Sequence, residues 1–167
     1  MSQSPPSWPA EGDPSSPFQV EPLDVLQSDL DDESPQVLGA LIDRLLAEGA
    51  LDAHLTPLFM KKNRPATRIE VLCHPDARDR FIRLLLTETS TLGVKVRRVE
   101  RYSLPRRMES ITLDGHSIRI KIALLDGQPL RAQPEFEDCK RAAQALGLPL
   151  KTILERAKIA AAQLLLP

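Results

Sequence analysis

The sequence predicts an α+β fold in which a βαββαβ core precedes an antiparallel hairpin and two C-terminal helices. Three observations lead to this prediction. Apolar residues recur at helical spacing within residues 37–46 and 81–85, and runs with strand character flank both segments. Asp114-Gly115 separates two runs of alternating apolar and polar residues, which is typical of a hairpin. Residues 135–165 contain two further helical patterns.

The first strand and helix of the core are expected within residues 20–49. Residues 20–30 have strand character and lead into an acidic run. Ser34 then provides a helix N-cap, and Pro35 occupies the first helical position, where its missing N–H costs nothing. The apolar residues that follow lie on one helical face, and Gly49 ends the helix.

The middle of the chain predicts a strand pair, a second helix and a further strand. Residues 51–59 and 68–73 have strand character and are joined by the connection 61–66. Pro75 opens the helix, and residues 94–97 alternate apolar with basic side chains, as one strand face alternates with the other. This order of elements is the split βαβ of a ferredoxin-like sandwich.

The last third of the chain predicts a hairpin and two helices. Residues 108–113 and 117–124 flank the turn Asp114-Gly115-His116, and Asp126-Gly127 marks another turn. A helix is expected over about 135–146, ended by Gly147, and a second over about 149–165.

Length and composition predict one ordered domain, residues 19–167, after a tail. Residues 1–18 contain five prolines and five serines, a composition typical of disorder. We expect a cytoplasmic protein with no membrane contact, because the sequence has no long apolar run and no signal-peptide pattern. Cys73 and Cys139 are far apart and form no disulfide or zinc motif, so two reduced, buried thiols are expected.

The net charge of −1 conceals an uneven distribution. Residues 1–60 carry eleven acidic side chains and one basic one, Arg44, whereas residues 61–167 carry twenty-one basic and twelve acidic side chains. Two interpretations fit this pattern. The basic part binds an anionic partner, or the acidic part packs against the basic part and neutralises it.

The most informative cluster is Lys61, Lys62, Asn63 and Arg64, followed by Pro65. Three cations within four residues repel one another unless an anion joins them, and Pro65 stiffens the turn. We therefore expect a phosphate or carboxylate ligand here; a solvated basic loop is the alternative.

Further donors follow the second helix. Thr89, Ser90 and Thr91 precede Gly93 and offer hydroxyls to oxygen ligands, although the same residues also suit a helix end. Arg101 and Arg106 add cations near the end of the basic strand, where each is also explicable as a surface arginine. These residues are our candidates for the remainder of an anion site.

Three carboxylates are candidate ligands for Mg²⁺ or Mn²⁺: Asp31, Asp32 and Glu135. Each also precedes or begins a predicted helix, where the helix dipole favours acidic residues without any metal. The three histidines have no ligand spacing, and the sequence contains no Walker-type or Gly-x-Gly-x-x-Gly phosphate motif.

Five motifs, taken in order, resemble the C-terminal half of the LarC-type nickel insertion proteins over about residues 20–165. They are Leu30-Asp31-Asp32 with Ser34-Pro35-Gln36, Gly49-Ala50-Leu51-Asp52, Met60-Lys61-Lys62-Asn63-Arg64-Pro65, Thr89-Ser90-Thr91-Leu92-Gly93-Val94 and Pro134-Glu135-Phe136-Glu137-Asp138-Cys139. The resemblance implies a lyase-class reaction, the CTP-dependent metallation of pyridinium bisthiocarboxylate mononucleotide. Its product is the nickel-pincer nucleotide cofactor of lactate racemase, and CTP binds with Mn²⁺ or Mg²⁺.

The N-terminal half of that family carries a histidine-rich nickel region, which three scattered histidines cannot replace. We therefore expect a nucleotide-handling subunit that forms a homo-oligomer and works with a separately encoded N-terminal half, which delivers the nickel. The alternative is a non-catalytic relic that binds nucleotide or oligomerises. Nucleic-acid binding is not expected, because the basic strand has one aromatic residue, Tyr102, and no alternating aromatic pair.

Overall fold

The computed structural model describes residues 16–165, which form two compact units where the sequence analysis expects one domain. The N-terminal unit is Glu21–Arg101. The described part of the C-terminal unit is residues 102–165, together with residues 16–20. Residues 1–15 of the predicted tail lie outside the described residues. No helix within residues 16–165 is long and apolar enough to cross a membrane.

The N-terminal unit has the predicted βαββαβ order. Its elements are β1 (Gln19–Leu30), α1 (Pro35–Ala47), β2 (Asp52–Met60), β3 (Arg64–Cys73), α2 (Arg78–Glu88) and β4 (Lys95–Ser103). The strands form one sheet in the order β2-β3-β1-β4, and β3 is antiparallel to both β1 and β2. Ser34 caps α1 as expected, since its Oγ accepts a hydrogen bond of 3.3 Å from the N–H of Gln36. A short 3₁₀ turn, Pro75–Ala77, precedes α2.

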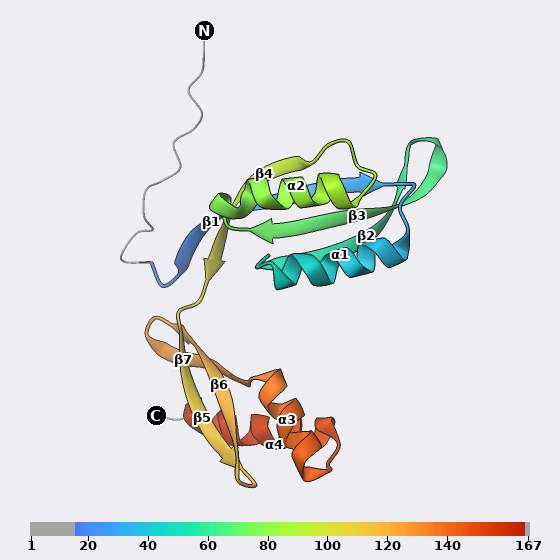
Figure 1. Cartoon of the computed structure of the whole chain (residues 1–167). Coiled ribbons are helices and arrows are strands. Elements are labelled where there is room, and N and C mark those ends of the chain that lie inside the picture. The colour runs from blue at the N-terminus through green and yellow to red at the C-terminus, as the bar shows by residue number, and fades with distance from the viewer. Residues whose placement is uncertain (1–15, 166–167) are drawn as a thin grey trace. The chain divides into compact units, whose positions relative to one another are not determined.

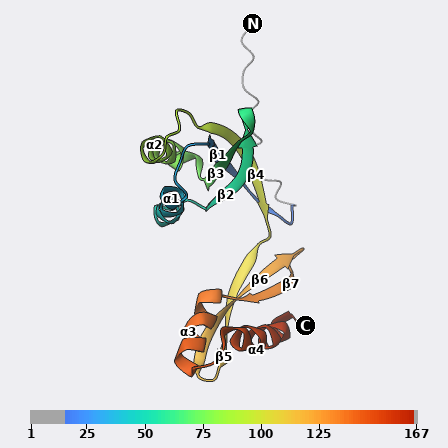
Figure 2. The same cartoon turned by 90° about the vertical axis from the view of Figure 1, so that its right-hand side faces the viewer.

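Both helices of this unit cover the same face of the sheet (Figures 1 and 2). Alternate residues of the strands point toward the helices, because successive strand side chains lie on opposite faces. The resulting core consists chiefly of Leu26, Leu30, Leu41, Leu45, Ile69, Val71, Phe81 and Leu85. The opposite face of the sheet carries charged side chains such as Asp29, Arg68 and Glu70, together with the apolar Val25 and Leu72.

The C-terminal unit contains a three-stranded antiparallel sheet and two helices. Its elements are β5 (Arg106–Leu113), β6 (His116–Leu125), β7 (Gln128–Pro134), α3 (Phe136–Leu146), α4 (Leu150–Ala162) and a last turn, Gln163–Leu165. The predicted hairpin is β5–β6, and β7 adds a strand that the sequence analysis does not predict. Pro129 and Pro134, together with weak apolar alternation, obscure β7 in the sequence.

Two Asp-Gly turns connect these strands. Asp114 and Asp126 have φ values of 47° and 51°, and the glycines that follow them have φ values of 80° and 76°. Positive φ at both central residues is the conformation that Asp-Gly favours in tight hairpins. One face of β6 then packs against α3 and α4 in a second core, whose fully buried members include Ile118, Ile120, Ile122, Cys139, Ile153 and Ala157.

Candidate functional site

Three segments of the N-terminal unit meet at one end of its sheet. β1 ends at Leu30, which lies opposite Thr67 of β3. Beyond this point β2 and β3 continue as a pair to Met60 and Arg64, so their hairpin projects past β1. The loop of residues 89–93 joins them, because the Ser28 hydroxyl of β1 donates a 3.0 Å hydrogen bond to the carbonyl of Gly93.

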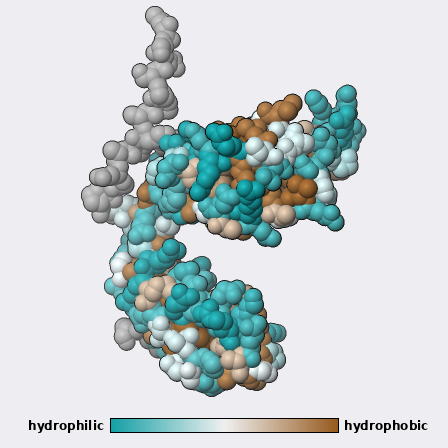
Figure 3. All heavy atoms as spheres, viewed as in Figure 1, coloured by the Kyte–Doolittle hydropathy of each residue, from teal (hydrophilic) through white to brown (hydrophobic). Residues whose placement is uncertain are grey.

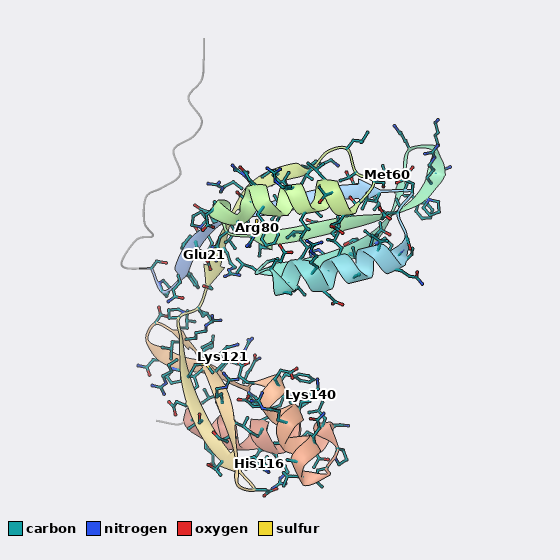
Figure 4. All side chains as sticks on the ribbon, viewed as in Figure 1. Glu21, Met60, Arg80, His116, Lys121 and Lys140 are labelled. Carbon is teal, nitrogen blue, oxygen red and sulfur yellow. The ribbon has the colours of Figure 1, made fainter. Side chains whose placement is uncertain are left out.

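The tip of the β2–β3 hairpin is Lys61–Asn63, and it has an unusual backbone. Lys62 and Asn63 have φ values of 63° and 56°, in the left-handed region that costs a residue with a side chain on the order of 1 kcal/mol. Within residues 16–165 neither Lys61 nor Lys62 makes a side-chain hydrogen bond or an ion pair. Figure 3 shows a hydrophilic surface over this tip, and Figure 4 shows the hairpin projecting beyond the labelled Met60. Such strain is typical of ligand-binding turns.

Residues 31–33, here called the acidic loop, connect the hairpin to the loop of residues 89–93. The Arg64 guanidinium donates to the Asp31 carboxylate at 2.9 Å. The Ser90 hydroxyl donates to Asp32 at 2.6 Å, and the backbone N–H of Ser90 donates to Glu33 at 2.9 Å. The hydrogen bond from Arg64 also lowers the pKa of Asp31. The carboxylates therefore occupy donors that could otherwise bind an anionic ligand.

Thr89 and Thr91 use their hydroxyls within the loop. The Thr89 hydroxyl donates to the carbonyl of Leu85 at 2.7 Å, and that of Thr91 donates to the carbonyl of Gly93 at 2.9 Å. The Thr91 N–H donates to the Thr89 hydroxyl at 3.3 Å. These bonds end α2 in the way that the alternative interpretation expects. They also hold the loop beside the acidic loop.

The structure brings together some of the predicted site residues and separates others. Lys61, Lys62, Asn63, Arg64, Thr89, Thr91, Asp31 and Asp32 all lie at this end of the N-terminal unit. Arg101 pairs with Glu21 at 2.6 Å at the opposite end of the sheet, where Figure 4 labels Glu21. Arg106 and Glu135 belong to the C-terminal unit, and Glu135 pairs with Lys121 at 2.7 Å.

The described residues contain no cluster of three or more His, Cys, Asp or Glu side chains able to hold a metal by themselves. Asp31 and Asp32 nevertheless place two adjacent carboxylates beside Lys61 and Arg64. Mg²⁺ and Mn²⁺ bound with a nucleotide need only one or two carboxylates, because phosphate oxygens and water complete the coordination. The acidic loop thus suits a nucleotide-bound divalent ion, whereas Glu135 is committed to Lys121 in the other unit.

Much of the uneven charge is neutralised within the N-terminal unit. The basic residues of β4 pair with acidic residues of β1 and β3: Lys95 with Asp29 at 2.8 Å, Arg97 with Glu70 at 3.3 Å, Arg98 with Asp24 at 2.6 Å and Arg101 with Glu21 at 2.6 Å. Self-complementarity therefore accounts for the basic strand. It does not account for Lys61 and Lys62 at the hairpin tip.

Comparison with known proteins identifies the family. A family model for "Nickel insertion protein" matches residues 11–154. The chain belongs to the nickel insertion protein family. A putative nickel insertion protein of Myxococcus xanthus is 43% identical over 137 residues, which are 82% of this chain and 35% of that protein. The pyridinium-3,5-bisthiocarboxylic acid mononucleotide nickel insertion protein of a Thermotoga species is 38% identical over 77% of this chain and 32% of its own length.

Solved structures agree with this family membership. LarC2, the C-terminal domain of a cyclometallase involved in synthesis of the NPN cofactor of lactate racemase, matches in its apo form with a TM-score of 0.79 and 30% identity. That match covers 87% of this chain and 99% of LarC2. A protein from Methanopyrus kandleri matches with a TM-score of 0.64 and 28% identity, over 87% and 90% of the two chains. The chain thus has the fold of a LarC2 domain and spans about a third of the length of its full-length relatives.

Asp29 fixes the strands beside the site. Its carboxylate accepts hydrogen bonds from Arg68 at 2.7 Å and from Lys95 at 2.8 Å, and its side chain is only 13% exposed. The Arg68 guanidinium and the Lys95 ammonium together hold the pKa of Asp29 well below its usual range. One carboxylate therefore joins β3 and β4 to β1.

Replacement of Asp29 with Asn should lower the free energy of unfolding at pH 7 by about 1–2 kcal/mol, a value reduced by the exposure of both partners. Because the folded-state pKa is lowered, the ion pairs stabilise the protein above the unfolded-state pKa of about 4. This contribution is lost as the pH falls toward the folded-state pKa. Urea unfolding from pH 7 to pH 2.5 should therefore show wild type and variant converging below about pH 4.

Asp43→Asn is the matched control, because Asp43 is exposed and has no ion-pair partner within residues 16–165. It makes the same change in charge without removing an ion pair. A stability difference for Asp29→Asn that stays constant down to pH 2.5 would contradict the assigned role.

Proposed function

We propose that this chain is the C-terminal, CTP-binding part or subunit of a nickel-inserting cyclometallase that completes the nickel-pincer nucleotide cofactor of lactate racemase. The observation that carries the proposal is the exposed, unpaired Lys61 and Lys62 on a strained hairpin tip beside the acidic loop. Similarity to LarC2 and to the Thermotoga mononucleotide nickel insertion protein supports the reaction class. Nickel is then the cargo of the reaction, delivered by the other part of the enzyme.

In this proposal the hairpin tip and the loop of residues 89–93 hold the triphosphate. Lys61 and Lys62 supply point charges, and Arg64 supplies a planar guanidinium that matches two phosphate oxygens. The backbone N–H of Ser90 is a further donor next to them. Arg64 and Ser90 reach the ligand only when they leave Asp31 and the other two carboxylates of the acidic loop.

Asp31 and Asp32 would hold the Mn²⁺ or Mg²⁺ that accompanies CTP, and that ion would neutralise phosphate charge. The cations of the hairpin stabilise negative charge that develops on the phosphates. This arrangement favours attack on the α-phosphorus by the mononucleotide precursor, with pyrophosphate as the leaving group. The precursor is thereby activated by a cytidylyl group before metallation.

Lys61→Ala combined with Lys62→Ala should lower CTP affinity in the presence of Mn²⁺ by at least tenfold, because two unpaired cations are lost from the phosphate site. The melting temperature should change little, since both side chains are exposed and neither makes an ion pair within the described chain. Isothermal titration calorimetry and thermal melts measure the two effects.

Lys151→Ala with Lys158→Ala provides the control, because it removes two exposed lysines of α4 and the same charge. Absence of any calorimetric or thermal response of the wild type to CTP and Mn²⁺ would refute the nucleotide proposal. So would an equal loss of affinity in the α4 variant.

Asp31→Asn combined with Asp32→Asn tests the metal assignment. We expect the ratio of CTP affinities with and without Mn²⁺ to fall toward one. Metal-free affinity should hold or rise, because two negative charges leave the phosphate site and free Arg64 and Ser90. Calorimetric titrations with Mn²⁺ and with a chelator give this ratio. An unchanged ratio, accompanied only by a lower melting temperature, would favour the alternative in which these carboxylates merely stabilise the start of α1.

Nickel insertion is proposed to require the part of the full-length relatives that this sequence does not match, about two thirds of their length. The purified chain with CTP, Mn²⁺, nickel and the bisthiocarboxylate mononucleotide should leave the precursor unmetallated, as mass spectrometry would detect. Adding the N-terminal part of a relative should restore metallation. Metallation by this chain alone would refute that requirement, and CTP binding without metallation in the mixture would favour the non-catalytic alternative.

A further inference from the structure

The three-stranded sheet of the C-terminal unit has one face that its helices leave uncovered. α3 and α4 pack against the face that carries Ile118, Ile120 and Ile122 (Figure 1). Because successive strand residues point to opposite faces, Arg119, Lys121 and Ala123 belong to the other face. Figure 4 labels Lys121 on this sheet. This face is here called the cationic face.

Two arginines occupy one row across the cationic face. Arg106 of β5 lies opposite Ala123 of β6, and Ala123 lies opposite Arg131 of β7. Residues directly opposite one another in an antiparallel sheet share a face. The two arginine backbones are therefore two strand spacings apart, roughly 10 Å, with only the Ala123 methyl group between them. Two long guanidinium side chains can converge on a ligand above that methyl group.

Neither arginine is neutralised by its surroundings. Within residues 16–165 Arg106 and Arg131 make no ion pair or side-chain hydrogen bond, and both are exposed. The strand positions on the cationic face contain no Asp or Glu. The other two cations of this face are each paired, Lys121 with Glu135 at 2.7 Å and Arg119 with Asp138 at 2.8 Å.

This arrangement differs from that of β4, whose arginines each have a carboxylate within 3.3 Å. The contrast indicates that an external anion completes the Arg106–Ala123–Arg131 row. The next row of the same face is Met108, Lys121 and Gln133, which adds an exposed thioether, a cation and an amide. Together the two rows offer two planar guanidinium groups for an oxyanion and apolar atoms for a ring beside it.

We propose that Arg106 and Arg131 bind the phosphate monoester of the mononucleotide substrate, apart from the CTP site. Each guanidinium presents a fork of N–H donors that matches two oxygens of a phosphate dianion. Strands 106–134 contain no Phe, Tyr or Trp on which successive bases could stack, so a single mononucleotide fits the face better than a polynucleotide. The identity of the mononucleotide rests on the proposed function, whereas the phosphate site itself does not.

The test uses the full chain and nicotinic acid mononucleotide, a pyridinium ribotide that carries a phosphate monoester. Arg106→Gln and Arg131→Gln should each weaken its binding about tenfold or more, measured by calorimetry at low ionic strength. Arg107→Gln is the matched control, because Arg107 is the next residue of β5, lies opposite Ile122 on the other face and is exposed. It should change the affinity less than about threefold, within the range of exposed charge effects.

Two further ligands test whether the arginines bind the phosphate of the mononucleotide or the triphosphate of CTP. Nicotinic acid riboside, which lacks the phosphate, should bind equally weakly to wild type and to both arginine variants, and CTP with Mn²⁺ should bind all of them alike. Undetectable binding of the mononucleotide to the wild type would overturn the proposal, as would an equal loss in Arg107→Gln. Equal losses for CTP would assign the arginines to the triphosphate and would also overturn it.

Salt-dependent RNA binding that depends on the same arginines and exceeds the mononucleotide affinity would overturn the proposal in favour of a nucleic-acid surface. Failure of the CTP proposal can be distinguished from failure of the mononucleotide proposal. The CTP proposal is tested by CTP titrations of the wild type and of the Lys61 and Lys62 variant. The mononucleotide titrations of Arg106 and Arg131 are read without CTP.

Discussion

The Asp29 carboxylate holds three adjacent strands in place at the end of the sheet where the candidate site lies. It accepts hydrogen bonds from Arg68 of β3 and from Lys95 of β4, and it belongs to β1 itself. The β2–β3 hairpin leads into β3, and the loop of residues 89–93 leads into β4. The bonds of Asp29 therefore help to fix the positions of both segments relative to the acidic loop. The site therefore depends on one mostly buried carboxylate whose desolvation is offset by two cations.

The positions of unpaired cations indicate where an anion binds more clearly than the total charge of the protein does. Most arginines of the N-terminal unit have a carboxylate partner, including those of the basic strand β4. Among the described residues, the unpaired cations that lie close to another unpaired cation include Lys61 and Lys62 on a strained turn, and Arg106 with Arg131 across one row of the second sheet. Arg83 and Lys158 also lack a carboxylate partner there, but each is a single residue on a helix. Unpaired cations held close together carry an electrostatic cost that an anion relieves, so these two places are where ligand binding gains most.

The sequence predicts most of the fold because local signals agree with the tertiary arrangement. Ser34 with Pro35 and the Asp-Gly turns are local features, and the structure has them where expected. β7 was missed because its stability comes from pairing with β6 and not from its own apolar pattern. The division into two compact units has no counterpart in the sequence analysis, since two separate cores leave no mark on composition.

The order of elements explains which of the predicted site residues lie close together in the structure. In an antiparallel βαββαβ sheet the end of β1, the β2–β3 turn and the start of β4 lie at the same end of the sheet. This arrangement brings Asp31, Lys61 and Thr89 to that end. The same topology carries Arg101 to the other end, because β4 runs away from the site. The contacts of Glu33 and Ser90 gave no sequence signal, since one of them uses a backbone N–H that any residue possesses.

Because of the acidic loop, the two lysines and Arg64 are expected to contribute differently to the affinity for an anion. Arg64 must exchange Asp31 for a phosphate, so it contributes only the difference between two charge-assisted interactions. Lys61 and Lys62 give up no ion pair among the described residues when they bind an anion, although Lys61 already interacts electrostatically with Asp31. The positive φ of Lys62 belongs to the turn that presents both lysines at the exposed hairpin tip, where neither has an ion-pair partner among the described residues.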